Sequence, residues 1–76
     1  MEKENAIIMI NQEYISAKKK FGDFHNTHEG IAVILEEFEE LKQEVFKKQS
    51  EYSLMDMRKE ACQLGAMALR FMIDCT

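Results

Sequence analysis

The sequence contains no proline and no tryptophan, and only three glycines among 76 residues. Proteins built on tight β-turns rely on glycine and proline at those turns, so this scarcity argues against a β fold. Apolar runs are also short, far below the roughly 20 residues that a membrane-spanning helix needs. The chain has no basic start followed by a long apolar stretch, as a signal peptide would. We therefore expect a cytoplasmic protein without a membrane partner.

Positive charge is scarce as well, because 14 acidic residues outweigh 10 lysines and arginines and leave a formal charge of −4. Nucleic acids are bound through clustered lysine and arginine, so we expect no nucleic-acid partner. An anionic ligand would need a cation to help neutralise it. The two cysteines, Cys62 and Cys75, are expected on one helix roughly 20 Å apart, which predicts free thiols because a disulfide cannot reach that far.

Apolar residues recur every three or four positions, which is the spacing of amphipathic helices. The first predicted helix covers about residues 2–20, and it ends in three lysines, followed by Gly22 as a terminator. Its expected buried stripe consists of Ile7, Ile8, Ile10, Tyr14, Ile15, Ala17 and Phe21. The chain therefore begins with a helix that needs a partner surface.

Two further helices are predicted, over about residues 27–48 and 52–74. Asn26 and Glu29 form a capping box before the second helix, and Ser50 or Ser53 can cap the third. The expected buried residues are Ile31, Ile34, Leu35, Phe38, Leu41 and Val45 on the second helix, and Leu54, Met57, Ala61, Leu64, Ala68, Phe71 and Met72 on the third.

A chain of this length buries only about 60% of the surface that its unfolded form exposes, so its core is small. We therefore expect one all-α domain over residues 1–76, an antiparallel helical bundle completed by oligomerisation. A homodimer and a homotetramer both fit this expectation.

Acidic residues crowd the second helix, where five of nine positions are glutamate: Glu36, Glu37, Glu39, Glu40 and Glu44. Glutamates three or four positions apart stack on one helical face and repel each other. Such a run is ordinarily a solvated surface. A divalent cation that accepts the carboxylates as ligands would also remove the repulsion.

The spacing of the second and third helices gives a geometric reason to consider a metal site. If they pair as a hairpin that turns near Ser50, Glu40 and Glu60 lie at the same height, ten residues from the turn. Glu37 and Gln63 then face each other thirteen residues from the turn. Oxygen ligands without histidine or cysteine favour Mg²⁺, with Mn²⁺ as a substitute.

At these positions the sequence resembles the MazG-like members of the all-α nucleoside triphosphate pyrophosphohydrolases. That family has Glu-Glu-x-x-Glu on one helix and Glu-x-x-Asp on the next; here Glu36-Glu37-Phe38-Glu39-Glu40 is followed by Glu60-Ala61-Cys62-Gln63. The stretch from Phe21 to Cys75 looks like small phage-type or bacterial members. The last ligand position differs, because Gln63 stands where the family has Asp.

The resemblance implies Mg²⁺-dependent hydrolysis of a nucleoside triphosphate to the monophosphate and pyrophosphate. Its metal ligands would be Glu37, Glu40, Glu60 and Gln63, with Glu36 orienting the attacking water. Arg58 and Lys59 are candidates for phosphate binding, and Arg70 can either join them or pair with Asp74. The alternative is a noncatalytic or degenerate helical interaction module, favoured by the small size and by Gln63, which adds no charge to a metal site.

Overall fold

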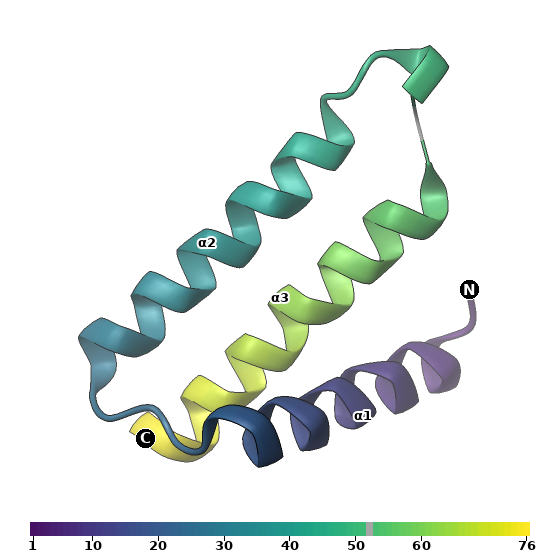
Figure 1. Cartoon of the computed structure of the whole chain (residues 1–76). Coiled ribbons are helices and arrows are strands. Elements are labelled where there is room, and N and C mark those ends of the chain that lie inside the picture. The colour runs from purple at the N-terminus through teal and green to yellow at the C-terminus, as the bar shows by residue number, and fades with distance from the viewer. Residues whose placement is uncertain (52) are drawn as a thin grey trace.

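The chain folds into three α-helices, as the sequence predicts, in a computed structural model that describes residues 1–51 and 53–76. Helix α1 covers Lys3–Phe21, α2 covers Thr27–Val45 and α3 covers Leu54–Cys75, and the short 3₁₀ helix η1 covers Gln49–Glu51 (Figure 1). Within those described ranges there are no β-strands, so the all-α prediction is confirmed.

Helices α2 and α3 form an antiparallel hairpin, and α1 lies across α3 (Figure 1). Helix α3 packs against both other helices, whereas α1 and α2, both fully described, do not pack directly against each other. The hairpin turn contains η1 and Ser50, where the sequence places it. This arrangement sets the acidic face of α2 beside α3.

Local hydrogen bonds explain where the helices begin and end. Asn26 Oδ1 accepts the Glu29 N–H at 2.9 Å, and Ser53 Oγ accepts the Asp56 N–H at 3.1 Å. Glu29 reaches back to the His25 N–H at 3.2 Å, one residue before the expected partner in the capping box. Helix α1 ends at Gly22, which has a φ of 72° that favours glycine.

The core is small and lies where the three helices meet. Its buried apolar members are Ala17, Phe24, Ala66 and Met67. Partly buried residues pack around them: Ile10, Tyr14, Val33, Ile34, Phe71 and Cys75. Among the described residues, Cys62 and Cys75 are the free cysteines, as their predicted separation on one helix requires.

Asp74 ties the end of α3 to the α1–α2 connection. Its side chain is only 2% exposed, and it accepts the Phe24 N–H and the Lys18 ammonium, each at 2.9 Å. The Phe24 hydrogen bond, followed by the one from Lys18, holds the pKa of Asp74 below its usual range. Arg70 does not form the expected ion pair with Asp74, because Lys18 takes that place.

The buried faces differ from the predicted ones in a systematic way. Helix α3 buries Ala66, Met67 and Arg70, whereas Ala61 and Ala68, expected inside, are exposed. Helix α3 contacts α1 and α2 on different sides, so its buried residues do not form the single stripe that the spacing of apolar residues predicts. The predicted residues that are instead exposed are Ile7, Ile8, Ile15 and Phe21 on α1, Ile31, Leu35, Phe38 and Val45 on α2, and Leu54 and Met72 on α3.

The boundaries of two helices also differ from those expected. Helix α2 ends at Val45 instead of near Lys48, because the chain must leave the helix early to cross to α3. The Phe46 N–H donates the last helical hydrogen bond, to the Lys42 carbonyl. The Phe46 side chain is exposed, so a longer helix would gain no packing there. The expected start of α3 at Tyr52 lies outside the described residues, and α3 begins at Leu54. In the described part of the chain, no helix combines the length and apolarity needed to cross a bilayer.

Candidate functional site

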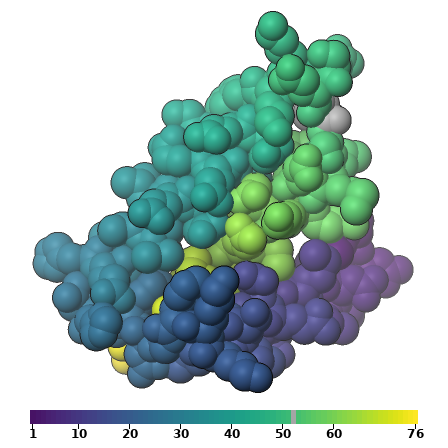
Figure 2. All heavy atoms as spheres, in the orientation of Figure 1, coloured from purple at the N-terminus to yellow at the C-terminus, as the bar shows by residue number. Residues whose placement is uncertain are grey.

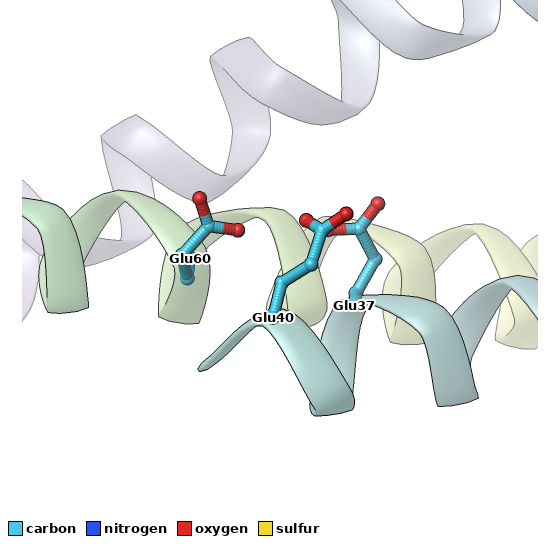
Figure 3. Close-up of side chains that lie close together, drawn as sticks. All are labelled: Glu37, Glu40 and Glu60. Atoms are coloured by element: carbon cyan, nitrogen blue, oxygen red, sulfur yellow. The ribbon is translucent and has the colours of Figure 1, made fainter. Parts of the chain in front are cut away.

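Three glutamates converge between the two helices of the hairpin. Glu37 and Glu40 project from α2 and Glu60 from α3, and one carboxylate oxygen of each lies within 4.8 Å of the other two. The three side chains extend to the same side of the α2–α3 pair (Figure 3). The structure therefore brings Glu40 and Glu60, which the hairpin register placed at the same height, together with Glu37 from the neighbouring rung; their role as metal ligands stays a prediction.

Gln63 joins the same cluster through its amide. The inner atom of this amide lies 3.2 Å from Glu37 Oε2 and 3.1 Å from Glu60 Oε2, and assigning it as the nitrogen makes it a donor to both carboxylates. Gln63 thus acts here as a hydrogen-bond donor that links carboxylates from both helices. To serve as a metal ligand it would have to turn over and present its oxygen.

Crowding of these carboxyl groups changes their acidity. Burial, followed by the charge of Glu40 and a hydrogen bond to it, raises the pKa of Glu37 to about 7, with smaller effects of Glu60 and Glu36. Burial and the hydrogen bond with Glu40 also raise the pKa of Glu60. At neutral pH the cluster therefore favours a shared proton or a bound cation over three separate negative charges.

A cavity of about 610 Å³ opens beside the cluster, between α1 and α2. We call it the interhelical cavity. Figure 2 shows a hollow in this region, with atoms of α3 visible between α2 and the end of α1. Glu36, Glu37 and Gln63 line the part next to the carboxylate cluster, and Lys20 and Arg70 supply its two positive charges.

Arg70 is a buried cation in the wall of this cavity. Only 3% of its surface is exposed, and no described carboxylate lies within ion-pair distance of it. The guanidinium donates to the Gly22 carbonyl at 2.8 Å and to the Met67 sulfur at 3.2 Å, and it lies 4.0 Å from the centre of the Phe24 ring. Its direct contacts are therefore all neutral, although Glu29 and Asp74 lie close enough that, besides the hydrogen bonds that each carboxylate accepts, its charge lowers the pKa of each.

A second cavity of about 540 Å³ lies on the other side of Gln63. Arg58 and Lys59, the predicted phosphate-binding residues, line it and are exposed. Glu13 lines both cavities, and the sequence reading missed it. The sequence did contain a signal for Glu13, because it is an acidic residue between Ile10 and Ala17 of the predicted buried stripe.

The remaining acidic candidates stand apart from the three-carboxylate cluster. Glu36 lines the interhelical cavity but contributes no oxygen to the convergent group. Glu44, one turn beyond Glu40, forms an ion pair with Lys47 at 2.8 Å. Glu44 is therefore engaged in a local ion pair.

Comparisons with protein-family models, curated proteins and solved structures find no match for this chain. The geometry alone defines the class: a small three-helix protein with a carboxylate cluster between two helices and a cavity at its side. The resemblance to the MazG-like pyrophosphohydrolases stays a hypothesis.

Proposed function

We propose that this protein is a Mg²⁺-dependent nucleoside triphosphate pyrophosphohydrolase of the MazG-like kind. The observation that carries the proposal is the convergence of Glu37, Glu40 and Glu60, from two helices, at the edge of the interhelical cavity. Carboxylate sites in helical bundles are built in this way, from side chains of facing helices.

The residues present fit a hard divalent cation. The donor set consists of carboxylate oxygens, which Mg²⁺ and Mn²⁺ prefer. Burial, followed by the proximity of Glu40, raises the pKa values of Glu37 and Glu60, and a bound cation offsets both effects. Glu37, Glu40 and Glu60 would hold the ion, and Gln63 would either turn its oxygen inward or keep orienting the carboxylates. Mg²⁺ bound there would neutralise the triphosphate and polarise its phosphoryl oxygens.

The charges of the interhelical cavity support a substrate that arrives with a cation. Four carboxylates line it, Glu13, Glu29, Glu36 and Glu37, against the two positive side chains of Lys20 and Arg70. A bare triphosphate would meet net negative charge, so binding needs the cation at the carboxylate end. Lys20 then offers a donor to phosphate oxygens, Arg70 adds its positive charge from within the wall, and the exposed ring of Phe21 offers aromatic surface to a base.

The reaction is a displacement at the α-phosphorus. Water attacks that atom, the bond to the oxygen bridging the α- and β-phosphorus breaks, and pyrophosphate leaves the nucleoside monophosphate. Glu36, which lines the cavity wall with Glu37, would orient the water and accept its proton. Arg58 and Lys59 face the neighbouring cavity, where they can assist only a phosphate chain that extends past Gln63.

The direct test is release of pyrophosphate from a panel of standard and modified triphosphates with Mg²⁺. Removing one ligand charge with Glu40→Gln should reduce turnover at least tenfold, because the substitution removes a proposed metal ligand. Glu39→Gln makes the same change in charge outside the cluster and should leave turnover within twofold. Absence of turnover in the unaltered protein across the panel would end the proposal.

A noncatalytic interaction module is the second candidate, and the Gln63 amide favours it. By donating to both Glu37 and Glu60, this amide holds the cluster together without an ion. The variant Gln63→Glu separates the two candidates, since it restores a negative charge at the expected ligand position. An enzyme should gain Mg²⁺ affinity and turnover, whereas a module should bind no stoichiometric ion in either form.

A further inference from the structure

Helix α2 carries an apolar stripe that no part of residues 1–51 and 53–76 covers. Ile31, Leu35, Phe38 and Val45 are 57%, 57%, 47% and 46% exposed. With Lys42, they follow the alternating spacing of four and three residues along one side of the helix. This is the pattern by which a helix packs along a second helix. We call these five residues the outer stripe.

The outer stripe is distinct from the face that α2 turns toward α3. That inner face contains Gly30, Val33, Ile34 and Glu37, which are buried or half-buried. Helix α2 therefore has two adjacent apolar faces and one partner helix. A helix that is apolar on two sides normally lies between two packing partners.

The accessible surface of the whole chain is larger than that of a compact monomer of the same mass, which leaves room for an interface. A compact monomer of 8.9 kDa exposes about 4,800 Å², whereas this chain exposes 5703 Å². The excess of about 900 Å² is close to the roughly 800 Å² that each partner buries in a standard protein interface. The radius of gyration agrees, at 13.1 Å against about 11.4 Å expected for 76 residues.

We propose that two copies of this chain pair through their outer stripes, with the two α2 helices antiparallel about a twofold axis near Leu35 and Phe38. A second copy matches the surface excess and brings an identical stripe of the same length. The pairing goes beyond the proposed catalysis and does not depend on it, since the cluster faces the interhelical cavity.

The antiparallel direction follows from the charges of α2. In a parallel pair, Lys42 would sit against its own copy inside the seam, and the helix dipoles would repel. In the antiparallel pair, the middle of the seam holds Leu35 and Phe38 of both copies. Each Lys42 then lies toward the partner subunit's Ile31, where its apolar stem can pack and its ammonium can reach water.

The test is the mass of the protein in solution, measured by sedimentation and by light scattering after size exclusion. The unaltered chain should have the mass of at least two copies at micromolar concentration. Leu35→Glu combined with Phe38→Glu should give single chains, with helical circular dichroism showing that the fold survives. Ile8→Glu, at an exposed apolar position of α1, is the control and should retain the larger mass.

Crosslinking tests the direction of pairing in the otherwise intact chain after Cys62→Ser and Cys75→Ser. Oxidation should link two copies of Leu35→Cys, which lie near the axis. It should not link Val45→Cys, whose copies are separated by about 25 Å along antiparallel helices. Links at both positions, links at neither, a wild-type mass of one chain, or loss of the larger mass in the Ile8→Glu control would each overturn the proposal.

Discussion

At the scale of residues, the Glu37 carboxyl is the group whose chemistry the fold changes most. An ordinary glutamate ionises near pH 4.3, whereas burial and the neighbouring Glu40 raise the pKa of Glu37 to about 7. At neutral pH this carboxyl is therefore protonated in part of the molecules. A cation can replace the proton there and is then bound by a fully ionised carboxylate. Ionised Glu37 thus lowers the stability of the fold, and the same carboxylate is a proposed ligand of the cation.

This shift predicts how stability depends on pH. The protonated carboxyl is favoured in the folded chain, so its contribution is complete below about pH 4 and is lost as pH rises through about 7. Because Glu37 is only partly buried, we expect the loss to be about 1–2 kcal/mol, less than its full shift would give. Urea unfolding from pH 5 to pH 8, without divalent cations, measures it.

Glu37→Gln should flatten most of that pH dependence. Glu60, whose pKa is raised in the same direction, should account for the remainder. Glu39→Gln is the matched control, since it removes one exposed charge of the same helix outside the cluster. Identical slopes in the two variants would show that Glu37 has no special pKa.

Asp74 is expected to matter for stability alone. Asp74→Asn removes the charge from two partly buried hydrogen bonds, those with Lys18 and the Phe24 N–H, and should lower the free energy of unfolding by about 2 kcal/mol. Asp23→Asn, which removes the exposed ion-pair partner of the same lysine, should cost less than about 0.5 kcal/mol. Urea unfolding at pH 7 compares them, and equal losses would contradict the account.

At the scale of elements, the contact between α2 and α3 depends on Gly30. A Cβ placed there would lie 2.7 Å from Phe71 Cδ2 and 3.1 Å from its Cε2, so the ring or the helix would have to move. We expect Gly30→Ala to lower the free energy of unfolding by about 1–3 kcal/mol. Thermal and urea unfolding provide the measurement.

Gly65→Ala is the comparison on α3. Its Cβ would meet the flexible end of Ile10 at 3.0 Å, which can rotate away. The gain in helix propensity, about 1 kcal/mol, should offset the contact and leave stability nearly unchanged. A larger loss at Gly65 than at Gly30 would mean that the hairpin is packed differently.

The sequence predicted the elements because their determinants are local. The spacing of apolar residues sets each helix, Asn26 and Ser53 cap α2 and α3, and Gly22 ends α1 in a conformation that suits glycine. The approach of Glu40 to Glu60 could also be predicted from the sequence, since a hairpin turn near Ser50 fixes the heights of both residues along their helices. Counting residues from a turn is sufficient when both helices are regular.

The rest depends on contacts between helices, which periodicity does not specify. Ala66 and Arg70 are buried because α3 touches α1 and α2 on different sides, and one stripe cannot describe two contacts. Four of the six α2 residues assigned to the core are exposed instead. Glu13 lies between two cavities because of the way α1 crosses α3. The sequence of α1 alone does not determine that crossing.

At the scale of the whole molecule, a large apolar surface surrounds a small core. Pairing of two chains through the outer stripe predicts that the thermal unfolding midpoint rises with protein concentration, because association adds stability by mass action. Scans at 2 and 200 μM should differ by several degrees. The double variant Leu35→Glu with Phe38→Glu should show no such dependence, and a concentration-independent midpoint in the unaltered chain would contradict pairing.

The carboxylate cluster and the outer stripe lie on different sides of α2, so the two functions proposed for this helix can be tested separately. The central claim concerns the cluster, and calorimetric titration with Mg²⁺ or Mn²⁺ at pH 8 tests it most directly. We predict a stoichiometric site that weakens at least tenfold in Glu60→Gln and is unchanged in Glu51→Gln, an exposed glutamate of η1. Absence of saturable binding, or equal binding by both variants, would contradict the account.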